Sequence, residues 1–182
     1  MNDRAYFNTV AALAVLAVLV AGGVGLAASG SPASAQTPAA AHPYYLNLSI
    51  AINATNGWPQ YSSTNFTVPR GEVVVTIVDH DMPMAWSGCG CVVAGTVGNR
   101  EYVNGSATGQ VASANVAHTF TVPQLGINVL SPGQSTVTFT LWLNQIGTFS
   151  WECMAPCGAG ANPYTSLPMG VPGFMAGTLA VA

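Results

Sequence analysis

Two cysteines four residues apart, Cys153 and Cys157, follow the apolar run "GTFSW". His118 precedes them at the start of a stretch of β-branched and aromatic residues, and Met169 and Met175 come after them. Thiolate and thioether sulfur beside an imidazole form a donor set that suits copper. One histidine from an earlier strand, with cysteine and methionine from the loop between the last two strands, predicts a copper site in a β-sandwich.

The same cysteines also allow a metal-free interpretation. Outside the cytoplasm paired cysteines are readily oxidised, so a structural Cys153–Cys157 disulfide is the alternative to a metal site. Cys89 and Cys91 in "SGCGC" are separated by one residue, which we take as too tight for an easy mutual disulfide. They would join a thiolate site or pair elsewhere, for instance with Cys153 and Cys157, and the three full pairings stay open.

The composition excludes several classes of function. Half of the 182 residues are apolar and only 5% are charged, against roughly 25% in a typical soluble protein. Neutral polar groups keep their hydration when carboxylates are protonated, so such a surface suits an acidic medium. A net charge of −3, with three Arg and no Lys, argues against nucleic-acid binding. Six carboxylates without a nucleophile motif argue against an enzyme that acts alone.

The N-terminal part of the chain predicts export. Residues 7–28 contain no charge and no proline, and a run of this length can cross a hydrocarbon core of ~30 Å. We therefore expect 1–28 to be a membrane anchor; the alternative is a signal peptide cut after "ASA" at 33–35. Residues 29–43 are small and Pro-containing, as in a linker. Both alternatives place the domain at 44–182 outside the cytoplasm.

From residue 44 onward the pattern predicts an all-β domain. Strands are expected in "YLNLSIAI", "TNFTVPRGEVVVTIVDHD" (two), "AHTFTV", "STVTFTLWL", "GTFSWEC" and "FMAGTLAVA", separated by "LSPGQ" and "NQIG". No stretch after residue 30 has a helical period. Seven or eight short strands predict a β-sandwich or Greek-key barrel. An insert at about 82–116 includes "GTVGNREYVNG", which predicts a hairpin with "GN" as its turn.

The C-terminal part resembles a known family. "VAHTFTVPQLGINVLSPGQSTVTFTLWLNQIGTFSWECMAPCGAG" and "FMAGTLAV" contain a histidine, "INV", "PG", "GTF" and C-x3-C-G-x-G in an order similar to the copper domain of subunit II of haem-copper oxidases. The resemblance covers roughly residues 117–180. It implies a cupredoxin-like Greek-key β-sandwich, carried by one N-terminal helix.

The resemblance also implies a ligand set. His118 matches the first imidazole ligand of the dinuclear copper centre of that family, the CuA site, and Cys153 and Cys157 match its two bridging thiolates. Ala155 stands where a backbone carbonyl is a weak ligand. Met175, directly before "AGTL", best matches the thioether ligand.

This sequence departs from that ligand set. Ala161 and Tyr164 stand where the family has its second histidine and its methionine. His80 or Met169 would then have to substitute, or the site would hold one copper with His118, one cysteine and a methionine. A disulfide would instead remove the metal, as in the copper-free subunits of quinol-fed oxidases.

The function that the resemblance implies is electron transfer. A membrane-anchored, extracytoplasmic copper domain would take electrons from a cytochrome, a small copper protein or a quinol and pass them to a haem-bearing subunit I. If the chain belongs to an enzyme, it is the non-catalytic electron-entry subunit of an oxidase. The alternatives are a copper-free, disulfide-stabilised accessory domain of a quinol oxidase and a stand-alone exported copper protein.

Overall fold

The computed structural model describes residues 42–83, 86, 89, 91–156 and 168–182. These residues belong to the second of two compact units, residues 38–182. Within the described ranges the only helical elements are single 3-10 turns, η1 (Val97–Asn99), η2 (Ser113–Asn115) and η3 (Pro123–Leu125). None of the described elements is a helix that could cross a membrane. The expected anchor at 7–28 lies outside the described residues.

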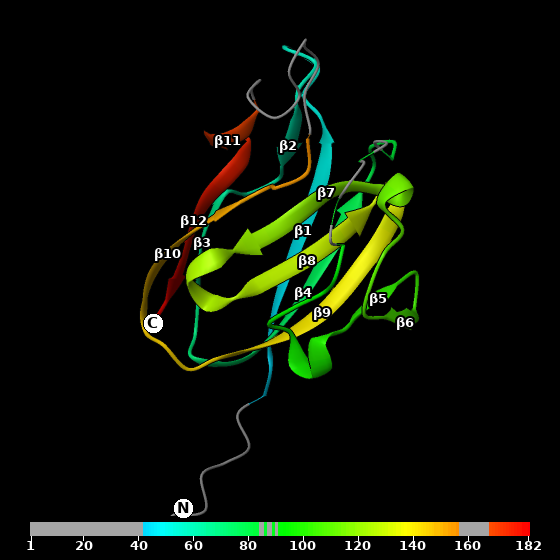
Figure 1. Ribbon diagram of the computed structural model, residues 1–182. Helices are drawn as coiled ribbons and strands as arrows, with labels where there is room; N and C mark the ends of the chain where they lie inside the picture. Colours follow the sequence, from blue (N-terminus) through cyan, green and yellow to red (C-terminus); the bar gives the residue numbers. More distant parts are fainter. Residues whose placement is uncertain (1–41, 84–85, 87–88, 90, 157–167) are drawn as a thin grey trace, which may run out of the picture. The chain divides into compact units, whose positions relative to one another are not determined.

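Twelve strands form two sheets (Figure 1). The first sheet has the order β2 (Pro59–Tyr61), β1 (Tyr44–Ile52), β4 (Gly71–Asp79), β9 (Ser135–Leu143), β5 (Glu101–Val103) and β6 (Ser106–Thr108). The second has the order β11 (Met169–Pro172), β12 (Met175–Val181), β10 (Gly147–Glu152), β7 (Val116–Val122) and β8 (Ile127–Pro132), with β3 (Asn65–Val68) paired to β12. The all-β expectation is confirmed.

Strict alternation along the central strands explains which face of each is buried. In β4 the residues Val73, Val75 and Ile77 are buried while their neighbours are partly exposed, and β9 repeats this pattern. The two sheets thereby enclose one apolar core. At its centre the ring of Trp151 lies 5.2 Å from that of Phe120, and its Nε1 donates a hydrogen bond of 2.9 Å to the carbonyl of Thr64.

The expected strands are present, and the structure adds β2, β8 and β11. Strand β8 begins at Ile127 and takes in Leu130 to Pro132 of the segment "LSPGQ", which we expected to be a separator. Its residues pair with β7, and Glu101 binds its Leu130 amide through a 2.9 Å hydrogen bond. Tertiary pairing therefore extends the strand up to a proline that sits at its last position.

The hairpin in the insert has a different turn from the one we predicted. Gly98 and Asn99 lie in the 3-10 turn η1, whereas the hairpin β5–β6 turns at Asn104 and Gly105. Both residues have positive φ, 48° and 83°. Asn-Gly is the strongest two-residue hairpin signal because this turn requires positive φ at both positions. The prediction of a hairpin is confirmed and its turn was wrong.

The register of the first sheet places two acidic residues, Asp79 and Asp81, at one end of the sandwich. Strands β1 and β4 are parallel (Figure 1), so both end at the same side of the domain, and β9 runs against them. Asp79 ends β4, and Asp81 follows it. We call this the metal end; Tyr44 and Gly71 begin their strands at the opposite end.

Candidate metal centre

An imidazole and a thiol face each other between β7 and the end of β10. The Nδ1 of His118 lies 3.9 Å from the Sγ of Cys153. Both side chains are 1% exposed, so neither contacts bulk water. Two donors at about 2.0 to 2.3 Å from one ion lie at most about 4.3 Å apart. The His118–Cys153 separation therefore fits two ligands of a single metal ion.

Backbone groups fix the position of the Cys153 sulfur. The amide of Thr119 donates to Sγ at 3.4 Å, and the carbonyl of Ala155 lies 3.8 Å from it. The Cys153 amide donates to the Met175 carbonyl at 2.8 Å, while the Met154 amide donates to Thr119 Oγ1 at 2.7 Å. The sulfur thus lies between the middle of β7, the end of β10 and the start of β12, with an amide donor beside it that stabilises negative charge on sulfur.

The second nitrogen of the His118 ring binds a carboxylate. Its Nε2 lies 2.8 Å from Asp81 Oδ2, and Asp81 is 8% exposed. A carboxylate that accepts the proton of one ring nitrogen orients the ring and fixes which nitrogen is available to a metal. Here it leaves Nδ1 directed at the sulfur of Cys153.

The charge state of His118 follows from these neighbours. Burial alone would lower the pKa of His118, but the hydrogen bonds to Asp81 and Cys153 outweigh it and raise the pKa to about 10. Without a metal the ring is therefore a cation between a carboxylate and a sulfur. A metal ion binding at Nδ1 would have to displace a proton from that atom.

A second carboxylate lies behind the first. Asp79 accepts hydrogen bonds from Ser131 Oγ at 2.7 Å and from the Asp81 amide at 3.0 Å. Burial raises its pKa to about 6, although the His118 charge works in the opposite direction. Ligand atoms of Asp79, Asp81 and His118 lie within 4.8 Å of one another. Two donor sets therefore share His118: an oxygen-rich one through Nε2 and a sulfur-containing one through Nδ1.

The two sets suit different ions. Carboxylate oxygen suits hard cations, whereas a thiolate beside imidazole suits copper and zinc. Because Asp81 is already hydrogen-bonded to Nε2, the imidazole nitrogen that remains for a metal is Nδ1. The chemistry of the described donors thus fits a soft, copper-type ion at His118 and Cys153, with Asp81 as the orienting carboxylate.

The structure places the other predicted ligands as follows. Ala155 and Met175 are both 0% exposed. The carbonyl of Ala155 lies 3.8 Å from the Cys153 sulfur, and the carbonyl of Met175 accepts the hydrogen bond of the Cys153 amide. His80 is exposed and does not belong to the Asp79–Asp81–His118 cluster. The Met169 backbone pairs with Met175 at the start of β11. Cys157, with Ala161 and Tyr164, lies outside the described residues.

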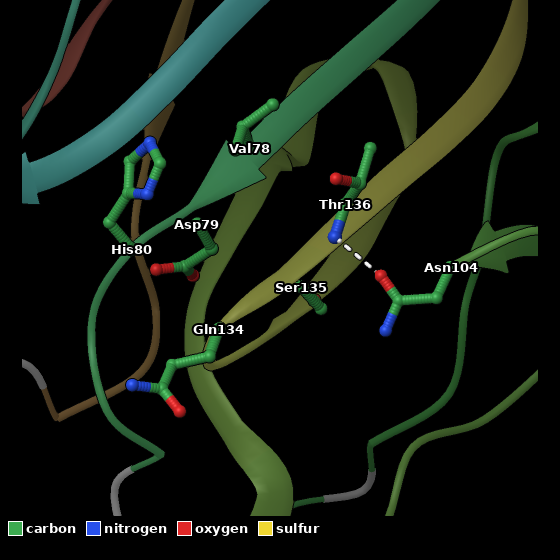
Figure 2. A pocket seen from close by; sticks show the side chains of 7 residues that line it. All are labelled: Val78, Asp79, His80, Asn104, Gln134, Ser135 and Thr136. Carbon is green, nitrogen blue, oxygen red and sulfur yellow. Dashed lines mark hydrogen bonds between the residues drawn. The ribbon is translucent and has the colours of Figure 1, made fainter.

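A shallow pocket opens beside this cluster. Asp79, His80, Gln134, Ser135 and Thr136 line it, with Val78 and Asn104 (Figure 2). Asn104 lies on the side opposite to His80 and accepts a 2.9 Å hydrogen bond from the Thr136 amide. Of the two buried carboxylates, Asp79 lines this pocket and Asp81 does not.

The pairing of Cys89 and Cys91 corrects our expectation. The two form a disulfide with each other, with a Cα–Cα separation of 5.0 Å, inside the usual range of about 4.4 to 6.8 Å. Local bending of the chain brings the Cα atoms closer than the spacing suggested. Bridges from this pair to Cys153 or Cys157 are thereby excluded.

Asp81 is the residue of this site that sequence reasoning missed. The available signal was "DHD" directly after the apolar strand "EVVVTIV", since two acidic residues at the end of a buried strand need a cationic partner. Only the fold shows that this partner is His118, 37 residues later.

Comparison with known proteins finds no matching family model and no matching curated sequence. Among solved structures, the chain is similar to a multicopper oxidase at 9% identity and a TM-score of 0.42, over 76% of this chain and 44% of that one. It is similar to auracyanin B at 14% identity and a TM-score of 0.38, over 79% of this chain and 93% of that one. It is similar to a mutant of amicyanin in its reduced Cu(I) form at 13% identity and a TM-score of 0.32, over 80% of this chain and 87% of that one. The chain spans less than half of the multicopper oxidase.

Proposed function

We propose that this protein is an exported, membrane-anchored electron-transfer domain of the cupredoxin type, with copper held by His118 and Cys153. The observation that carries the proposal is the buried pair of Nδ1 and Sγ, 3.9 Å apart, with a carboxylate on the other ring nitrogen. A bound copper ion would supply one-electron transfer between its Cu(I) and Cu(II) states. The Ala155 carbonyl, 3.8 Å from the Cys153 sulfur, would be a further donor, and we propose Met175, whose backbone carbonyl accepts the Cys153 amide, as the thioether ligand.

The protein residues have separate tasks in this proposal. Asp81 holds the proton of His118 at Nε2 and keeps Nδ1 directed at the sulfur. The Thr119 amide stabilises negative charge on Cys153 Sγ. Burial in a sandwich of paired strands keeps the donors in place when the ion changes charge, which lowers the reorganisation that electron transfer requires.

The metal end also offers a short path to the surface. Met154, next to Cys153, is 45% exposed, and Met82, next to Asp81, is 65% exposed. An electron-transfer partner that contacts this end would approach the sulfur donor to within one residue. We propose as that partner a haem-bearing oxidase subunit, with a cytochrome, small copper protein or quinol as donor.

Copper loading of the full chain tests the proposal. The purified protein is incubated with copper, dialysed, and measured for bound copper, visible absorption and electron paramagnetic resonance. We expect bound copper with a thiolate-to-copper absorption band, because the described site contains a cysteine sulfur. The variant Cys153→Ser should lose the band, whereas the double variant Cys89→Ser/Cys91→Ser should keep it.

The spectrum also separates the alternatives. One unpaired electron shared by two coppers would indicate a CuA-like centre, and a single copper with a thiolate band would indicate a mononuclear one. Copper without any thiolate band, or no copper at all, would contradict the proposal.

One observation favours a second candidate, a copper-free structural domain. The Cys89–Cys91 disulfide shows that the fold accommodates an oxidised cysteine pair. Moreover, the His118–Asp81 pair satisfies both buried charges without a metal. A protein that folds and binds its oxidase partner equally well after Cys153→Ser would support this candidate.

A further inference from the structure

Four exposed apolar side chains, three of them aromatic, lie at the end of the domain opposite to the metal end. Tyr45 is 66% exposed, Trp142 59%, Ile146 64% and Tyr44 39%. We call these four residues the aromatic end. Scattered apolar side chains are normal on protein surfaces, but a group of them at one end indicates a contact surface.

The sheet register places two of these side chains, Tyr45 and Trp142, on one face. Tyr45 of β1 is aligned with Val74 of β4, which is aligned with Thr140 of β9. Trp142, two residues after Thr140 in β9, is aligned with Glu72 near the start of β4. Alternation puts Tyr45, Val74 and Trp142 on the same outward face. Ile146 follows in the connection between β9 and β10.

Charge is sparse around these side chains. Among the described residues, the charged side chains at this end are Glu72, opposite Trp142, and Arg70, directly before β4. These two side chains carry opposite signs, and Ala182, the last residue of the sequence, lies beside them and accepts a hydrogen bond from the Arg70 amide. Arg70 and Glu72 are both exposed and can reach water or lipid headgroups beside the rings. The surface therefore combines few charged side chains with amphipathic aromatic ones.

We infer that the aromatic end rests on the lipid surface of the membrane, at the boundary between headgroups and acyl chains. Tyr and Trp are enriched at that boundary because one part of each ring is apolar and the other is polar. The chain itself supplies the reason for choosing a membrane: the apolar run 7–28 lies upstream of Tyr44, separated by the linker 29–43. Fifteen linker residues reach about 50 Å at most, so the anchor keeps this end near the bilayer. The inference rests on the anchor in the proposed function.

This contact would fix the orientation of the metal centre. Glu72 and His80 lie at opposite ends of β4, eight residues apart, which corresponds to roughly 26 Å of strand. The donors His118 and Cys153, with the orienting Asp81, would then face the aqueous side, away from the lipid. Electron-transfer partners would have to dock from that side.

Fluorescence quenching by brominated lipids tests the inference on the full chain. The protein is reconstituted into phosphatidylcholine vesicles with ordinary or acyl-brominated lipid, and tryptophan emission is compared. The N-terminal 41 residues contain no tryptophan, so quenching reports on the domain. We expect quenching in the wild type and its loss in Trp142→Phe. The matched control is Trp58→Phe, which removes a half-buried ring beside β2 at the metal end and should leave the quenching unchanged.

The outcomes separate the two proposals. If the chain does not stay with the vesicles after carbonate washing, the anchor is wrong and the proposed function fails in that part. If the chain stays with the vesicles but Trp142 is not quenched, the anchor stands and the inference is overturned. Unquenched Trp142 with blue-shifted emission would show that a second copy or another protein covers the aromatic end, which also overturns it.

Discussion

At the scale of single residues, the two nitrogens of His118 have different partners, and that difference decides the chemistry. A histidine that faced only Asp79 and Asp81 would be half of an ion pair in an oxygen-rich cluster. The Nδ1–Sγ contact of 3.9 Å makes it one of two donors with different softness. Asp81 then acts through the ring, by holding the proton at Nε2.

Asp81→Asn tests this role. The amide keeps the shape of the side chain but removes its charge, so the ring loses the partner that makes it a better ligand. We expect copper affinity to fall by roughly 10- to 100-fold, measured by competition with a chelator, with a changed paramagnetic spectrum of the remaining copper. Glu72→Gln, at the opposite end of β4, is the control and should leave both unchanged. Equal affinity in Asp81→Asn and the wild type would contradict an orienting role.

The candidate residues of the site could be selected from sequence, and their geometry could not. His118, Cys153, Ala155 and Met175 were selected from residue types, order and resemblance. In the structure His118 and the Ala155 carbonyl lie beside the Cys153 sulfur, whereas Met175 contacts Cys153 through its backbone carbonyl. Asp81 could not be assigned, because a contact across 37 residues depends on how two sheets pack rather than on local pattern.

At the scale of elements, the hairpin β5–β6 carries a buried carboxyl group into the core. Glu101 is 0% exposed, its Oε2 accepts the Leu130 amide at 2.9 Å, and its Oε1 has no partner among the described residues. Burial raises the pKa of Glu101 to about 7, although the bond to Leu130 works against it. Strands β6, β8 and β9 contain no titratable side chain that would compensate a charge there.

This carboxyl group predicts a dependence of stability on pH. The unfolded carboxyl titrates at 4.5 and the folded one at about 7, so the folded state binds more protons in between. Its stabilising contribution is complete below pH 4.5 and is lost as the pH rises through 7. Glu101→Gln should match the wild type near pH 4 and exceed its free energy of unfolding by up to about 3 kcal/mol above pH 8. Urea unfolding at several pH values measures this, and a difference that is constant with pH would contradict it.

The turn of the same hairpin gives a second prediction. Gly105 has a φ of 83°, and an added Cβ would meet no atom within 4 Å, so the cost of Gly105→Ala is conformational. We expect a loss of about 1 to 2 kcal/mol in the free energy of unfolding, measured by urea denaturation. Ser106→Ala, at the exposed neighbouring position, should change it little. An unchanged stability of Gly105→Ala would mean that the turn is not as described.

Strands were predicted correctly where apolar and polar residues alternate strictly. They were missed where only pairing with a neighbouring strand makes the segment extended. Strands β4 and β9 were visible as alternating β-branched residues because each buries one face. Strand β2, three residues long, exists through its antiparallel pairing with β1, and no periodicity reveals so short an element. Likewise, the hairpin turn was misplaced because two dipeptides compete, Gly98–Asn99 and Asn104–Gly105, and the choice between them depends on which residues pair with β9.

At the scale of the whole molecule, the described surface is nearly free of charge. Of the described Asp, Glu and Arg side chains, Arg70, Glu72 and Arg100 are exposed, Glu152 is half-buried, and the remaining acidic groups are buried. Exposed ion pairs therefore contribute almost nothing to the stability of this domain.

Low sensitivity to salt follows. The free energy of unfolding of the copper-free protein should change by less than about 0.5 kcal/mol between low salt and molar sodium chloride. The buried His118–Asp81 pair does not alter this expectation, because buried pairs are screened little. Thermal unfolding followed by circular dichroism measures it. A strong salt dependence would show that charges outside the described residues interact with the domain.

The central claim, that His118 and Cys153 hold one copper ion, is tested most directly by copper X-ray absorption on the loaded full chain. The account predicts a sulfur scatterer at roughly 2.2 to 2.3 Å together with nitrogen at about 2.0 Å, with the sulfur lost in Cys153→Ser. A first shell made only of nitrogen and oxygen would place the metal in the Asp79–Asp81–His118 cluster instead. That result would contradict the proposed electron-transfer site.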